Sequence, residues 1–250
     1  MAEFVDPYLD PETGILRNLV GARTQQELAA AEGALVFARV VEMADHPPRP
    51  TGDLAELRAI HHALFQDLFD WAGQLRTVDI RKSVEGAQYF LPVSMIDRAA
   101  SFAFGQLAEE RTLRGMSRDQ FIERFAHHYD QVNYIHPFRE GNGRTQRVFW
   151  GRIAGAAGWQ LDWRKVDGSV NDHACRVAAE QSDFGPMHEM LDQIVAPIPH
   201  RSTEASAAAR VARQSLPRPV ADDMKNPAPS PPRRRSGNGP AKDQDYGRGD

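Results

Sequence analysis

Apolar residues recur every three or four positions over most of the first 200 residues, which predicts amphipathic helices. Thr24 and Glu27 form a capping box that starts one such helix. Ser117 and Gln120 form another before a helix that continues to about Val132. The pattern therefore predicts an all-α domain.

Other helix starts have simpler signals. Asp53 precedes an apolar stripe at helical spacing, and Pro92 stands where a proline commonly opens a helix. Further helices are predicted over about residues 143–157, 170–180 and 186–195.

One interval departs from the helical pattern. In residues 75–91, Val78 and Ile80 alternate with polar residues, Gly86 offers a turn, and an aromatic pair follows. This pattern predicts a short β-hairpin. Because a lone hairpin is only marginally stable, we expect a mobile projection from the helical body.

Composition changes near residue 201. The last fifty residues hold seven of the seventeen prolines and few large aliphatic residues, so they cannot bury enough apolar surface to fold. We expect disorder there, with Arg233–Arg235 as part of a solvated linker or, alternatively, a docking or export signal. The predicted divisions are an N-terminal helical region packed on the core (1–45), the core domain (46–200) and a Pro/Arg-rich tail (201–250).

Charge and composition exclude several classes of protein. The tail has ten Lys and Arg against six Asp and Glu, so the first 200 residues carry −8 of the total −4, which argues against direct nucleic-acid binding. No apolar run reaches the length of a membrane span. The N-terminus lacks the features of a secretory signal and Cys175 is the only cysteine, so we expect a cytoplasmic protein without a disulfide.

The candidate chemistry lies in residues 136–147, HPFREGNGRTQR, between two predicted helices. Gly141 and Gly143 flank Asn142 and allow a ligand to approach the backbone closely. Successive N–H groups leading into a helix N-terminus form a site for an anion.

The charged residues of this segment specify the anion. Arg144 and Arg147 lie one helical turn apart, and guanidinium groups suit phosphate oxygens. Phosphate would repel Glu140 unless a cation such as Mg²⁺ stood between them. His136 can accept a proton near neutral pH. The set predicts a phosphate-transfer site.

Residues 136–147 match the motif HPFx(D/E)GNGRxxR at every fixed position, and the chain therefore resembles the Fic-domain family. The segments DPYLDPETGILRN, WAGQLRTVDIRKS and QSDFGPMHEML also look like Fic segments, so the resemblance covers roughly residues 6–195. It implies a helical bundle with a β-hairpin flap and transfer of AMP from ATP to a Ser, Thr or Tyr hydroxyl of a target protein.

The resemblance also implies roles for individual residues. His136 would deprotonate the target hydroxyl, Glu140 would hold Mg²⁺, and Phe138 would anchor the loop. The residues implied to bind ATP phosphates are Gly141, Asn142 (near the α-phosphate), Gly143, Arg144 and Arg147, with Lys82 and Ser83 bordering the nucleotide. Those implied to dock the target on the flap are Thr77, Val78, Asp79 and Ile80.

Many Fic proteins carry an inhibitory helix with the pattern (S/T)xxxE(G/N). Glu32 and Gly33 provide the ending, but Leu28 stands at the first position, and no other segment fits. We therefore expect an active toxin that a separate small antitoxin controls. The candidate target is the ATPase subunit of a type II topoisomerase, such as gyrase B; secretion as a translocated effector is a second possibility.

Two other functions are open at this point. The same fold could transfer phosphate, UMP or phosphocholine, although Gly143 stands where the phosphate-transferring branch has Lys. The chain could also be a non-catalytic helical binding module. The pairs His61-His62 and His127-His128 do not predict zinc, because adjacent helical residues point in different directions.

Overall fold

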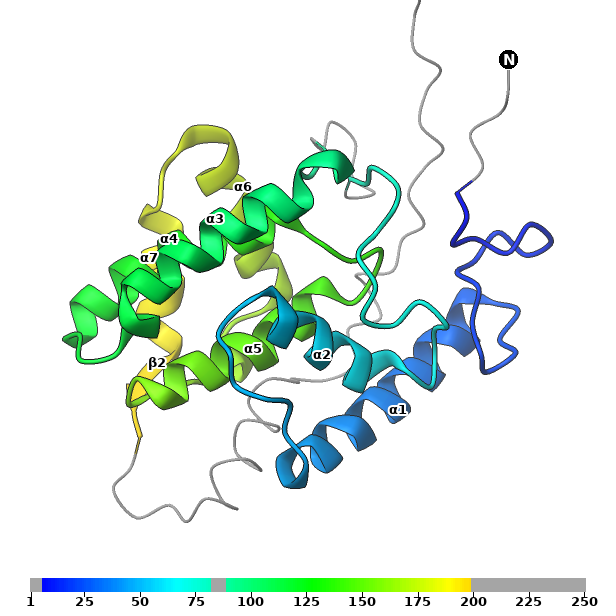
Figure 1. The fold of residues 1–250 in the computed structure, drawn as a ribbon, viewed down its shortest axis with the longest axis horizontal. Helices are drawn as coiled ribbons and strands as arrows, with labels where there is room; N and C mark the ends of the chain where they lie inside the picture. The colour runs from blue at the N-terminus through cyan, green and yellow to red at the C-terminus, as the bar shows by residue number, and fades with distance from the viewer. Residues whose placement is uncertain (1–5, 82–88, 199–250) are drawn as a thin grey trace, which may run out of the picture.

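The computed structural model describes residues 6–81 and 89–198, in which seven α-helices surround one apolar core (Figure 1). The helices are α1 (Gln25–Asp45), α2 (Leu54–Phe65), α3 (Ile96–Glu109), α4 (Arg118–Ile135), α5 (Asn142–Ala156), α6 (Gly168–Gln181) and α7 (Gly185–Ile194). The all-α prediction is confirmed.

The capping residues start the helices as the sequence predicts. Thr24 and Glu27 exchange side-chain and backbone hydrogen bonds at the start of α1, and Ser117 and Gln120 do the same at α4. Asp53 accepts a hydrogen bond from the N–H of Glu56 at the start of α2. These side chains satisfy N–H groups that have no partner within the helix.

Three helices frame the segment 136–147. Figure 1 shows α1, α2 and α5 close together, and α2 packs against both of the others. The segment itself forms the loop between α4 and α5 together with the first turns of α5. The site therefore lies where α4 ends and α5 begins, and α2 covers one side of it.

The described strands differ from the prediction. The antiparallel pair is β1 (Trp159–Leu161) with β2 (Val195–Pro197), in register Gln160 to Ala196. Both strands are three residues long, too short to show a period in the sequence. In the predicted hairpin, the described part contains one antiparallel bridge, Arg81 to Tyr89, and residues 82–88 lie outside the described residues.

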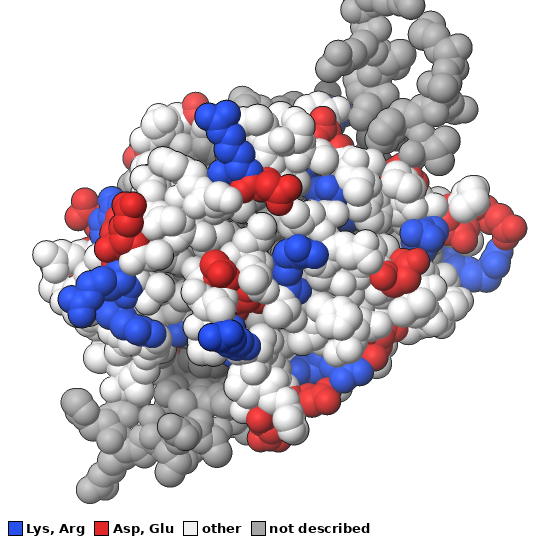
Figure 2. Space-filling view, in the orientation of Figure 1, with Lys and Arg blue, Asp and Glu red and all other residues white. Residues whose placement is uncertain are grey.

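The face drawn in Figure 2 carries Lys and Arg interspersed with Asp and Glu. No helix among the described residues is long and apolar enough to cross a membrane. The predicted tail, residues 201–250, lies outside the described part of the chain.

Candidate active site

His136 ends α4 with φ 44° and ψ 62°, a left-handed conformation that is uncommon for a residue other than glycine. Its ring stacks on Phe90 with 3.7 Å between centroids. Its Nδ1 lies 3.1 Å from the carbonyl oxygen of Asn133. Because a carbonyl can only accept, Nδ1 carries the proton and the lone pair of the neutral ring is on Nε2. The imidazole is thus held in the tautomer of a general base.

Arg76 fixes the backbone beneath this histidine. Its buried guanidinium donates hydrogen bonds to the carbonyl oxygens of Val78 (2.9 Å), Ile135 (3.3 Å) and His136 (2.8 Å), and to that of Leu91. Burial lowers the pKa of the group. Arg76 therefore ties the end of α4 to the segments on both sides of the predicted flap.

Asn142 closes the loop that follows. Its side-chain oxygen accepts from the N–H of Phe138 at 2.9 Å, and its amide donates to the carbonyl of the same residue at 2.7 Å. Phe138 is itself buried. The side chain of Asn142 thus holds the loop shape, so that its backbone N–H, more than its amide, is available to a phosphate.

His61 supports the loop from α2. Gly73 N–H donates to its Nδ1 at 2.7 Å, so Nε2 carries the proton and donates to the carbonyl oxygen of Glu140 at 3.0 Å. The ring stacks on Phe138 at 3.9 Å. Burial lowers the pKa of His61 to about 3, which keeps it neutral at physiological pH. His61 is a structural histidine, consistent with the interpretation against zinc.

The start of α5 is built to receive an oxyanion. Gly141 is the N-cap, with φ 77°, and it supplies no side-chain cap. Its N–H donates to Glu140 Oε1 at 2.9 Å. A carboxylate oxygen of the chain itself therefore lies against the first N–H of the loop, where the helix dipole favours negative charge.

Arg144 lies in the first turn of α5 between two carboxylates. Its Nη2 forms an ion pair with Glu32 of α1 and lies 3.4 Å from Glu140 Oε1. The guanidinium carbon is 5.2 Å from the centre of the Phe65 ring. Its neighbours are thus protein carboxylates as well as the phosphate predicted from the sequence.

Arg147 lies one turn further along α5. Its guanidinium carbon is 5.5 Å from the centre of the Trp163 ring, a cation–π contact. Both arginines are partly exposed, so both can reach a ligand at this end of the helix.

The segment that leads into the predicted flap alternates in burial. Val78 and Ile80 are buried, whereas Thr77 and Asp79 are exposed. A docked strand would therefore meet the backbone and the two polar side chains of this segment. Lys82 and Ser83 lie outside the described residues.

The N-terminal segment also contacts the site. The carboxylate of Asp6 pairs with Arg139, within the 136–147 segment, at 2.9 Å. The hydroxyl of Tyr8 accepts from the N–H of Thr77 at 3.0 Å. Residues before α1 are therefore attached both to the loop and to the start of the flap segment.

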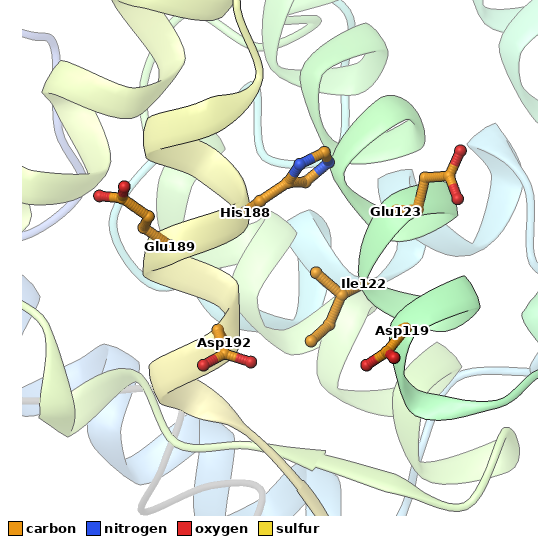
Figure 3. Close-up of a pocket in the computed structure, with 6 residues that line it drawn as sticks. All are labelled: Asp119, Ile122, Glu123, His188, Glu189 and Asp192. Atoms are coloured by element: carbon orange, nitrogen blue, oxygen red, sulfur yellow. The ribbon is translucent and has the colours of Figure 1, made fainter.

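A separate hollow of about 370 Å³ lies between α4 and α7 (Figure 3). Its lining residues are Asp119, Ile122, Glu123, His188, Glu189 and Asp192. Glu123 and Glu189 point away from each other in Figure 3. Among the described residues, no group of three or more His, Cys, Asp or Glu could hold a metal ion. The hollow is near the start of α4, about 25 Å of helix from His136.

Sequence reasoning did not assign the supporting residues Glu32, His61 and Arg76 to the site. A polar side chain within an apolar stripe of α2 was a signal for His61. Arg76 stands in the quoted segment WAGQLRTVDIRKS, but its role depends on four backbone carbonyls that no local pattern reveals. Glu32 was considered only for an inhibitory motif.

Comparison with known proteins agrees with this geometry. Residues 51–153 match the Fic/DOC family. The chain is 42% identical over 192 residues to the probable protein adenylyltransferase Fic of Escherichia coli K12, covering 76% of this chain and 92% of that protein. It is 39% identical over 162 residues to the protein adenylyltransferase VbhT of Bartonella schoenbuchensis, covering 65% of this chain but only 33% of VbhT.

Solved structures with the same fold include nucleotide complexes. The BepC protein of Bartonella tribocorum with bound AMPPNP has a TM-score of 0.69 and 26% identity, covering 77% of this chain and 97% of that one. The N-terminal Fic domain of a putative cell filamentation protein of Bartonella quintana with bound ADP has a TM-score of 0.71 and 27% identity, covering 76% and 94%.

Proposed function

The chain belongs to the Fic/DOC family, and we propose that it transfers AMP from ATP to a Ser, Thr or Tyr hydroxyl of a target protein, releasing pyrophosphate. The observation that carries the proposal is the position of His136, a base of defined tautomer directly before an anion-binding loop. Two related proteins with the same fold bind AMPPNP and ADP, which supports a nucleotide as the phosphate donor.

In the proposed reaction, the hydroxyl oxygen attacks the α-phosphorus and the bond to the β-phosphate oxygen breaks. Nε2 of His136 accepts the hydroxyl proton as the new P–O bond forms. Phe90 and the carbonyl of Asn133 keep the ring from rotating, so the lone pair stays directed during the step. The remaining catalysis is positioning and charge stabilisation.

The backbone N–H groups of Gly141, Asn142 and Gly143 are the proposed ligands of the phosphate oxygens. The α-phosphate would approach Asn142, whose side chain preserves the loop shape. Arg144 and Arg147 would meet the β- and γ-phosphates and stabilise the departing pyrophosphate. Lys82 and Ser83 remain proposed neighbours of the nucleotide.

Glu140 fits the role of a magnesium ligand. Its carboxylate is partly exposed, and its hydrogen bonds with Gly141 and Arg144 both use Oε1. A single carboxylate beside substrate phosphates is a common way for a protein to hold Mg²⁺, which explains why no cluster of three ligands is needed. When bound, Mg²⁺ would neutralise charge on the phosphates.

The target is proposed to dock against the segment Thr77–Ile80 by strand addition, using its backbone and the exposed Thr77 and Asp79. The first candidate remains the ATPase subunit of a type II topoisomerase such as gyrase B. The proposed setting is the cytoplasm, where a small antitoxin would supply an inhibitory glutamate in trans. The chain itself is proposed to be active without removal of any segment.

The test is transfer of label from ATP to proteins of a bacterial lysate. Label from α-³²P-ATP should appear on a protein band, and label from γ-³²P-ATP should not. His136→Ala should reduce the rate about 10²–10⁴-fold while nucleotide binding persists. Retention of the γ-label would instead indicate phosphate transfer. Mass spectrometry of the band distinguishes AMP from UMP and phosphocholine. A folded protein that labels nothing and binds no nucleotide would be a binding module.

A further inference from the structure

Glu32 places a carboxylate in the interior next to the proposed nucleotide site. It lies on α1, outside the range that matches the Fic/DOC family, and its side chain is 1% exposed. A buried carboxylate is costly unless an opposite charge compensates it. The charge that meets it is the guanidinium of Arg144.

Arg144 has a second carboxylate within reach. Its Nη2 is 3.4 Å from Glu140 Oε1, and the contact with Glu32 is the closer of the two. The ring of Phe65 lies against the same guanidinium. The position of Arg144 is therefore a balance between one carboxylate on α1 and one in the loop.

This balance affects the oxygen atoms that a cation would use. A guanidinium that pairs fully with Glu140 neutralises it and competes with a divalent ion for the same carboxylate. Glu32 opposes that pairing, because it offers Arg144 a closer anion that solvent does not screen. With Glu32 neutral, Glu140 would be the nearest remaining anion among the printed neighbours of Arg144.

We propose that Glu32 is a positioning residue which, by holding Arg144, keeps Glu140 available for the magnesium ion of the Mg–nucleotide complex. This inference rests on the proposed function, since it concerns the cation at that site. It assigns to α1 a part in setting how much Mg²⁺ the protein requires.

The structure offers a matched control. Glu56 on α2 is also buried, at 2% exposure, and it pairs with another arginine of α5, Arg152, at 2.6 Å. Arg152 lies more than two helical turns from Arg144. Glu32→Gln and Glu56→Gln therefore remove the same kind of buried ion pair from the same helix, but only Glu32 faces the proposed site.

The measurement is calorimetric binding of AMPPNP to the full chain at a series of Mg²⁺ concentrations and in EDTA. Glu32→Gln should raise the Mg²⁺ concentration for half-maximal binding by about fivefold or more, a shift equivalent to roughly 1 kcal/mol. Binding in EDTA should not weaken. Glu56→Gln should keep the wild-type Mg²⁺ requirement, and Glu32→Asp, which restores the charge, should return most of the shift.

A double variant tests the route through Arg144. In an Arg144→Gln background, adding Glu32→Gln should no longer change the Mg²⁺ requirement, because the competing guanidinium is gone. If Glu32→Gln does not fold, Glu32→Asp should still show an intermediate requirement for Mg²⁺.

The inference is wrong if Glu32→Gln and Glu56→Gln have the same Mg²⁺ requirement as the wild type. It is also wrong if Glu32→Gln weakens AMPPNP binding equally with Mg²⁺ and in EDTA, because Glu32 would then act on the phosphates or on the fold. If the wild-type protein itself binds no AMPPNP at any Mg²⁺ concentration, the proposed function fails as well.

Discussion

The ring of Phe65 lies so close to Gly141 that a Cβ added to the glycine would stand 2.4 Å from its Cζ atom. Gly141 also has φ +77°, a conformation that side chains disfavour. Gly141→Ala should therefore destabilise the fold by about 2–4 kcal/mol, through strain and the clash together. Urea unfolding monitored by circular dichroism measures this loss.

Gly21 is the control for that substitution. It has φ +70°, but nothing lies within 4 Å of an added Cβ. Gly21→Ala should cost only the strain, about 1–2 kcal/mol. Equal losses for the two variants would show that Phe65 yields easily and does not fix the loop.

Gly143 separates binding from stability. It lies in the first turn of α5 with open space around an added Cβ, as does Gly155 near the end of the same helix. Alanine at either position should leave stability unchanged or raise it by about 0.5–1 kcal/mol. Only Gly143→Ala should weaken AMPPNP binding, because its backbone is proposed to touch phosphate. Calorimetry on both variants checks this, and equal affinities would count against that contact.

Acid should destabilise the protein partly through His61. Its pKa is near 6.5 in the unfolded chain and about 3 in the fold, so the fold binds fewer protons between these values. The stability that neutral His61 contributes is present above pH 6.5 and is lost progressively as the pH falls toward 3. His61→Gln should reduce the slope of unfolding free energy against pH between 4 and 6 by up to about 1.4 kcal/mol per unit.

Asp130 provides a comparison of opposite sign. Burial raises its pKa from 3.8 to about 6, so its contribution to stability is lost as the pH rises through that window. Asp130→Asn should therefore make the same slope steeper. Unfolding curves of the two variants and the wild type at pH 4, 5 and 6 give the three slopes, and a change of the same sign in both variants would contradict these assignments.

Arg76→Lys should show that the four carbonyl contacts need a guanidinium. An ammonium group has three donors on one nitrogen and cannot span four backbone oxygens, so at least one buried carbonyl loses its partner. We expect a loss of about 2 kcal/mol or more in unfolding free energy. Transfer of AMP should also slow at temperatures where the variant is fully folded, because the backbone of His136 loses its support.

Arg118→Lys is the corresponding control at the other end of α4. Arg118 pairs with Asp192 on the surface side of α7, where ion pairs contribute little. This substitution should change stability by less than about 1 kcal/mol and leave the transfer rate intact. A comparable loss for both variants would mean that Arg76 has no special role.

The sequence predicted those features that depend on neighbouring residues. The capping boxes at Thr24 and Ser117 fix the starts of α1 and α4, because a cap and its partner are three residues apart. The loop and its glycines were identified for the same reason, since the whole motif spans twelve consecutive residues.

Features that join distant segments were not predictable in this way. Glu32 and Arg144 meet only because α1 and α5 pack in the same region, and nothing in the pattern around Glu32 identifies its partner. The pairing of β1 with β2 likewise joins segments on either side of α6 and α7. Such contacts depend on the packing angles of helices, which hydrophobic spacing does not specify.

The contacts made by residues before position 51 limit how this enzyme can be divided. A chain starting at Thr51 would keep all of residues 51–153, and with them every residue of the motif. It would nevertheless lack the carboxylate facing Arg144 and the hydroxyl that accepts from Thr77. Exchange of domains between relatives should therefore join the chains upstream of Asp6, so that the helix and the loop it supports are inherited together.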